Sequence, residues 1–205
     1  PTEPSEPIDP SEPTEPSEPT EPENSDDEVI EQSDRLKAVI AHVMNAMTYG
    51  RNIEGSLYPQ LFVDGINPET KEPIIWRQRQ NDDVFNNYMS NLHSQSNLLR
   101  VLDKLTDITG DEKYREAAYD QLTVRYDTPE LMDSNSLMYA GAHCFVDVVT
   151  GRIGGTIPSQ HEVKDSLLPI DLYYDANPER FKDYVTAIWS THVVDAGTLA
   201  MNRHA

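Results

Sequence analysis

The sequence has 205 residues, and its 16 Lys and Arg against 36 Asp and Glu give a formal net charge of −20 at pH 7. Nucleic-acid-binding proteins carry a basic surface, and the absence of any Lys and Arg cluster argues against that class. The sequence contains no run of about 18 apolar residues, so no helical membrane span is expected. With a single cysteine, Cys144, the chain cannot form an intrachain disulfide.

Residues 1–28 are acidic, and proline occupies every third position from Pro1 to Pro22. They hold 11 of the 36 acidic residues and no Lys or Arg. Proline fixes φ near the polyproline II value, and without an apolar run the segment cannot offset the entropy of folding. We therefore expect a disordered linker over residues 1–28 and a folded domain over residues 29–205. Such linkers are typical of modular proteins that are secreted or periplasmic.

Hydrophobic spacing predicts a helix over residues 34–47, followed by an ordered loop with one short strand up to about residue 80. Leucines at helical intervals predict a second helix over 90–109. Gly110 and Asp111 then end that helix and begin a third over 111–122, which makes an antiparallel helical hairpin.

The valine-rich region 139–156 predicts a strand pair or an extended loop between glycines. Two further helices are expected over 165–174 and over 178–190, where Pro178 suits a first helical turn. The fold class is therefore mainly α. The long connections 51–89 and 127–165 favour helical hairpins with elaborate loops, as in an incomplete α/α toroid, over a simple bundle with short connections.

Candidate ligands for a metal lie in the loops of the second half. Residue type and position single out His143, Glu162 and His204, since two imidazoles and one carboxylate suit manganese, iron, cobalt or nickel better than a closed zinc site. His161, which immediately precedes Glu162, would face the opposite way in an extended segment. We interpret the remaining histidines as core, surface or helix-end residues, namely His42, His93 and His192.

Several cations and aromatic residues could bind substrate. Arg203 adjoins His204 and could bind an anion through its planar fork, although a surface cation is the alternative. Trp76 could stack on a sugar ring, and Arg77 and Lys164 are further loop cations. Trp189, at helical spacing, is expected in the core. The sequence has no G-x-S-x-G nucleophile motif and no phosphate-binding glycine loop.

Five blocks of the sequence together resemble the periplasmic pectate lyases of polysaccharide lyase family 2 and allied bacterial α/α-toroid proteins. The resemblance covers most of residues 45–205. The blocks that carry it are Leu61–Asn67 with Trp76 and Arg77, Asn97–Gly110, Gly141–His143, His161–Lys164 and Asn202–His204.

The resemblance implies that His143, Glu162 and His204 hold a divalent metal, with manganese, nickel or cobalt favoured over calcium, and that Arg203 is the catalytic base. It implies β-eliminative cleavage of a uronate polysaccharide, most simply pectate, by a protein tethered to an upstream carbohydrate-binding module. Because the family's proteins are longer, residues 29–205 would be the N-terminal part of a toroid, inactive alone.

Two other classes of function stay open from the sequence. A toroid glycoside hydrolase would use paired acids, with Asp64 or Asp83 acting with Glu162. A carbohydrate-binding or scaffold module would bind the polymer and leave its length unchanged. An arginine is also an unusual base, because its ordinary pKa exceeds about 12 and its surroundings must favour the neutral form.

Overall fold

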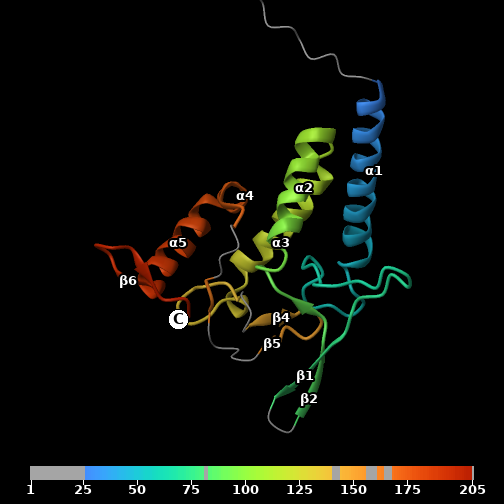
Figure 1. The fold of residues 1–205 in the computed structure, drawn as a ribbon. Coiled ribbons are helices and arrows are strands. Elements are labelled where there is room, and N and C mark those ends of the chain that lie inside the picture. The colour runs from blue at the N-terminus through green and yellow to red at the C-terminus, as the bar shows by residue number, and fades with distance from the viewer. Residues whose placement is uncertain (1–25, 81–82, 140–143, 156–160, 164–167, 205) are drawn as a thin grey trace, which may run out of the picture. The chain divides into compact units, whose positions relative to one another are not determined.

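The computed structural model describes residues 26–80, 83–139, 144–155, 161–163 and 168–204. Helices are the longest elements, and the short strands form small antiparallel sheets (Figure 1). The elements in chain order are α1 (Asp26–Tyr49), β1 (Trp76–Gln80), β2 (Asp83–Asn87), β3 (Met89–Ser90), α2 (Ser96–Thr109), α3 (Lys113–Asp127), the 3-10 helix η1 (Pro129–Leu131), β4 (Phe145–Asp147), β5 (Ile153–Gly154), α4 (Ile170–Ala176), α5 (Pro178–His192), β6 (Val193–Asp195) and β7 (Ala200–Met201).

Helix α1 contains the predicted helix 34–47 and begins earlier, at Asp26. The chain divides into two compact units within this helix, residues 1–36 and residues 37–205. In the second unit, Val43 of α1 is fully buried. The prediction of a disordered linker falls mostly on residues 1–25, which lie outside the described part of the chain. Among the described residues, no helix has the length and apolar character needed to cross a bilayer.

Helices α2 and α3 form the predicted antiparallel hairpin and lie side by side in Figure 1. Leu99, Leu102 and Leu105 place one stripe of α2 in the core. Gly110 ends α2 at φ 74°, a left-handed conformation that glycine adopts without strain. Helix α2 begins at Ser96 rather than at residue 90, because Met89 and Ser90 pair with β4 instead.

The strand pair expected within 139–156 is present as β4 and β5, and β3 adds a third antiparallel strand. Asp147 fixes the turn after β4, since its Oδ1 accepts the backbone N–H groups of Val149 and Thr150. Gly154 lies against Phe145, and an added Cβ would come within 2.5 Å of the Phe145 ring. This sheet contributes to a core cluster formed by Leu61, Val63, Leu131, Val146 and Val148.

Strands β1 and β2 form an antiparallel hairpin in which Trp76 pairs with Asn87 and Gln78 with Phe85. Only one short strand was predicted near this position. The sequence Trp-Arg-Gln-Arg-Gln of β1 lacks the apolar alternation that indicates a half-buried strand. The hydrophobic pattern therefore does not predict this hairpin.

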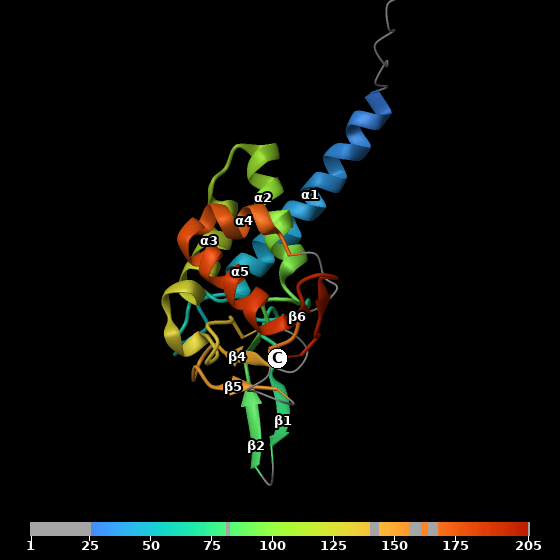
Figure 2. The same ribbon diagram turned by 90° about the vertical axis from the view of Figure 1, so that its left-hand side faces the viewer.

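Helices α4 and α5 form a second hairpin, and α4 packs on α3 (Figure 2). Pro178 occupies the first turn of α5, as predicted, and the Asn177 side chain accepts the Arg180 N–H. Helix α5 presents Tyr184 and Ala187 to the core. The prediction that Trp189 is a core residue is wrong, since it is 51% exposed on the other side of α5.

The two helical hairpins and the long loops between them confirm the mainly α class. The described residues form no closed ring of hairpins, so the incomplete α/α toroid stays a prediction. The β6–β7 pair after α5 was not predicted. It returns the chain from the end of α5 to residues 202–204, which carry predicted site residues.

Candidate active site

Two segments far apart in the sequence meet in the candidate site. Glu162 and His204 form an isolated antiparallel bridge, and the Val163 N–H donates to the Arg203 carbonyl over 2.9 Å. The backbone pairing therefore sets the 161–163 segment beside the 202–204 segment. Three of the residues singled out from the sequence, Glu162, Arg203 and His204, come together in this way.

Glu162 is the centre of this arrangement. It is fully buried, and its Oε1 accepts hydrogen bonds from Arg203 Nε at 2.7 Å and from a terminal guanidinium nitrogen. His204 Nε2 lies 3.6 Å from the same oxygen. The Arg203 side chain remains 62% exposed. A buried carboxylate thus holds an arginine whose outer part is open to solvent, where an anionic ligand could reach it.

Two of the three predicted metal ligands lie within the described residues. Glu162 Oε1 and His204 Nε2 are 3.6 Å apart, and a carboxylate oxygen with an imidazole nitrogen is a donor pair that suits a divalent transition metal. The third predicted ligand, His143, lies outside the described residues, as does Lys164. Among the residues that the structure describes, no group of three or more His, Cys, Asp or Glu side chains converges on one point.

A buried pair of histidines, His161 and His192, adjoins the two segments of this site. His161 Nδ1 is 2.8 Å from His192 Nε2, and His192 Nδ1 is 2.8 Å from the Asn202 carbonyl oxygen. Burial, together with the neighbouring His192 and His93 rings, lowers the pKa of His161 to about 3. Sequence reasoning missed this pair because α5 and the 161–163 segment meet only in the folded chain.

Successive side chains of β1 point to opposite faces of the β1–β2 hairpin, and this places the predicted substrate-binding residues Trp76 and Arg77 on different faces. Trp76 and Gln78 lie on one face of the β1–β2 hairpin, and Arg77 and Arg79 on the other. Gln78 faces the body of the unit, since its amide donates to the Gly155 carbonyl and its oxygen accepts the Gly155 N–H.

The opposite face of this hairpin is cationic and exposed. Arg77 and Arg79 are both exposed, and neither forms an ion pair with a described residue. Arg79 was not singled out from the sequence. Once residues 76–80 are recognised as a strand, the alternation of side chains places Arg79 on the same face as Arg77 and would have identified it.

The acids proposed for a hydrolase lie in separate networks. Asp64 Oδ1 accepts the Asn91 N–H at 2.8 Å and the Gln95 amide at 2.6 Å, whereas Glu162 binds Arg203. Burial raises the pKa of Asp64 to about 6, although these hydrogen bonds and the charge of Arg125 lower it. Asp83 begins β2. No described contact joins Asp64 to Glu162, and the paired-acid alternative stays a prediction.

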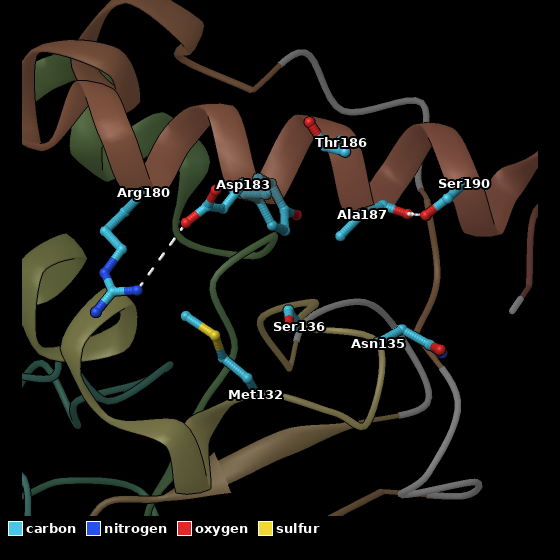
Figure 3. Close-up of a pocket in the computed structure, with 9 residues that line it drawn as sticks. Met132, Asn135, Ser136, Arg180, Asp183, Thr186, Ala187 and Ser190 are labelled. Carbon is cyan, nitrogen blue, oxygen red and sulfur yellow. Dashed lines mark hydrogen bonds and ion pairs between the residues drawn. The ribbon is translucent and has the colours of Figure 1, made fainter.

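A further pocket, of about 350 Å³, lies between the segment after η1 and helix α5 (Figure 3). Figure 3 shows Met132 and Ser136 on one side and Asp183 and Ala187 of α5 on the other. None of the predicted site residues that the structure describes lines it. Tyr184 connects it to the histidine pair, since its ring meets that of His161 edge-on at 6.4 Å.

The helical fold with long loops, and the arginine–carboxylate–histidine cluster that joins two of them, are consistent with the class of helical proteins that the sequence resembles. The model of the family described as periplasmic pectate lyase matches residues 59–205. The chain therefore belongs to the periplasmic pectate lyase family, in agreement with the expected secreted or periplasmic location.

A curated relative supports this assignment. The pectate disaccharide-lyase of Dickeya dadantii (strain 3937) is 32% identical to the chain over 172 residues. The match covers 82% of this chain and 30% of the relative. The chain thus spans about 30% of the length of this relative.

Proposed function

We propose that the chain forms part of a polysaccharide lyase that cleaves a uronate polymer of the pectate class by metal-assisted β-elimination, within an α/α toroid. The observation that carries the proposal is the contact of Arg203 with the buried Glu162 carboxylate beside His204. The family, and the name of the Dickeya relative, support the reaction and the substrate class.

Glu162 and His204, with His143, would hold a divalent metal, with manganese, nickel or cobalt favoured over calcium. The donor set supports this choice, because an imidazole paired with a carboxylate suits these metals, whereas calcium prefers oxygen ligands alone. Such a metal, when bound, would supply positive charge that binds the uronate carboxylate and makes the C5 proton more acidic.

The chain's own contribution to the reaction is to remove that proton. Arg203 would accept the C5 proton, the electron pair of the C5–H bond would form the C4=C5 double bond, and the C4–O glycosidic bond would break with its oxygen as the leaving group. The neutral guanidine is the form that can accept a proton. Glu162 holds the inner edge of Arg203, and the 62% of the side chain that stays exposed could reach a substrate.

The decisive experiment uses the full-length protein with pectate and manganese. Elimination creates an unsaturated uronate at the new chain end, and its ultraviolet absorbance should rise with time. A chelator should abolish the signal, and manganese, nickel or cobalt should restore it better than calcium. No absorbing product from pectate, alginate or ulvan, with manganese supplied, would contradict the proposal.

The cationic face of the β1–β2 hairpin would bind the polymer outside the cleavage point. Replacing Arg77 or Arg79 by Ala should raise the KM for pectate by about three- to tenfold and leave kcat unchanged, since exposed arginines contribute binding energy equally in the ground and transition states. Steady-state kinetics at low and high salt provide the measurement. The effect should shrink at high salt, and Arg77→Lys should retain most of the affinity. A fall in kcat with unchanged KM would contradict this role.

On the other face of the hairpin, Trp76 is 45% exposed and could stack on a sugar ring. Because alternation separates Trp76 from Arg77, the two would contact different parts of the polymer. Lys164, which follows Glu162 by two positions in the sequence, remains a candidate substrate-binding cation. The net charge of −20 says little about the substrate, because 11 of the 36 acidic residues lie in residues 1–28. Tethering to an upstream carbohydrate-binding module would keep the enzyme near its polymer.

The substitution Asp64→Asn distinguishes a hydrolase that uses Asp64 as a catalytic acid from a lyase that does not. The folded state binds a proton at Asp64 below about pH 6, whereas an unfolded Asp does so only below about pH 4. Unfolding therefore releases a proton between these values, and the free energy of unfolding falls as the pH rises through this window. Above about pH 6 the folded state bears the full cost of the buried charge.

Asp64→Asn should remove this cost. At pH 7 the free energy of unfolding should rise by up to about 3 kcal/mol, because each unit of pKa shift corresponds to about 1.4 kcal/mol, and the gain should vanish near pH 4. Denaturant titrations at both pH values test this expectation. Lyase activity should persist in the variant, whereas a hydrolase that used Asp64 would lose its activity.

A further inference from the structure

His192 holds the residue before Arg203 by both of its backbone groups. The Asn202 N–H donates to the His192 carbonyl over 2.7 Å, and the Asn202 carbonyl accepts from His192 Nδ1 over 2.8 Å. His192 is fully buried at the end of α5. Because Arg203 directly follows Asn202, this pair of bonds sets where the Arg203 backbone begins.

The positions of the hydrogens follow from the acceptor at one end. A carbonyl oxygen can only accept, so we assign the ring hydrogen of neutral His192 to Nδ1. Its Nε2 is then an acceptor, and His161 Nδ1, 2.8 Å away, must donate. The result is a directed chain of hydrogen bonds from His161 through His192 to the Asn202 carbonyl.

These hydrogen bonds join the two backbone segments that carry the candidate site. His161 directly precedes Glu162, and Asn202 directly precedes Arg203. The hydrogen bonds from His161 through His192 to Asn202 therefore link the same two segments that the direct Glu162–Arg203 contact links. The His161 ring is itself held in place, since it meets the rings of His93 and Tyr184 edge-on at 6.2 Å and 6.4 Å.

A role limited to ending α5 would not need the imidazole. The backbone already closes the helix, because the Val193 N–H donates to the Trp189 carbonyl. The His192 ring instead points to the strand return and to His161. Its contacts are thus directed at the two site segments.

We propose that His192, with His161 as its support, is a positioning residue that aligns Arg203 and His204 against Glu162. This inference rests on the proposed lyase function and deepens it. Residues of this kind touch neither substrate nor metal, yet their loss typically lowers activity or metal affinity about 10- to 100-fold. A displacement of about 1 Å at a reacting group has a cost of similar size.

The test compares three substitutions of His192 in the full-length protein. Asparagine places its amide nitrogen where Nδ1 lies and keeps the donor to Asn202, whereas glutamine places it near Nε2 and alanine removes both. We expect His192→Ala and His192→Gln to lower kcat on pectate about 10- to 100-fold, with KM changed by less than about twofold. His192→Asn should stay within about fivefold of the wild type, since it keeps the bond to the Asn202 carbonyl.

The matched control is His42→Ala, which removes an exposed histidine from α1 and should leave kcat unchanged. Equal loss of kcat in His192→Ala and His192→Asn would overturn the inference. So would a rise in KM at unchanged kcat, because it would indicate weakened substrate binding rather than misplacement of the base.

Hydrogen exchange separates this inference from the lyase proposal. The Val163 amide donates from one site segment to the other, the Asn202 amide donates to the His192 carbonyl, and the exchange of both can be measured without substrate or metal. Both should exchange faster in His192→Ala but not in His192→Asn, while α5 keeps its protection. Equal exchange in the two variants would refute the positioning role even in an active lyase. An inactive wild type with this exchange pattern would refute only the lyase proposal.

Discussion

Replacing Arg203 by alanine should lower kcat on pectate by about 10³-fold or more while the fold is retained. A general base typically contributes about 10²- to 10⁴-fold, and Arg203 also holds the Glu162 carboxylate in place. Initial rates of unsaturated product formation give the measurement. Arg203→Lys should recover little activity, since a lysine lacks the planar fork that contacts Glu162 through two nitrogens.

Two controls make this result interpretable. Arg180 is a second surface arginine, 51% exposed and 3.7 Å from Asp127, and Arg180→Ala should keep full activity. Metal binding should persist in Arg203→Ala, because the predicted ligands are intact. Activity within tenfold of the wild type would contradict the role of Arg203 as base, and loss of both activity and metal would indicate a structural role instead.

The largest expected effect on stability is at Arg125. This side chain is fully buried, its guanidinium donates to the Ser90 hydroxyl at 2.9 Å, and it lies 3.3 Å from the Tyr139 carbonyl. Burial lowers the pKa of Arg125 to about 10, although the nearby Tyr173 and Asp64 raise it. Arg125→Ala should lower the free energy of unfolding by about 3–5 kcal/mol, because it opens a cavity and leaves buried acceptors unpaired.

Arg125→Met is the matched control for this substitution. Methionine fills much of the same volume without a charge, so it removes the hydrogen bonds but limits the cavity. We expect a loss smaller than that of Arg125→Ala, since apolar replacements of buried charges are often close to neutral. Urea titration of both variants is the measurement. Equal stability of the wild type and Arg125→Ala would show that the buried guanidinium contributes nothing.

Hydrophobic patterns predicted the presence of the helices better than their bounds, since α1 begins at Asp26 rather than 34 and α4 at Ile170 rather than 165. Leu99, Leu102 and Leu105 fix both the existence and the buried face of α2. The start of α2 was misplaced because Met89 and Ser90 pair with a strand more than fifty positions along the chain, and such pairing leaves no local pattern. The β1–β2 hairpin was missed for a different reason, since its residues are mostly polar.

For the candidate site, too, the residue types could be predicted from the sequence, whereas the contacts between distant segments could not. The types of Glu162, Arg203 and His204 indicated the chemistry, and the fold brings these three together. The supporting histidines could not be found in the same way. His192 resembled a helix-end residue, and only the return of the chain through β6 and β7 places Asn202 against it.

The Glu162–Arg203 contact also has a consequence for folding kinetics. Its two partners are 41 residues apart, and closing a flexible loop of that length costs about 3 kcal/mol of chain entropy. The intervening residues include α4 and α5, whose contacts with each other are local. The hairpin can therefore form early, whereas the carboxylate and the guanidinium meet only after it has docked. Assembly of the candidate site would be a late step, and its appearance would mark the end of folding in this part of the chain.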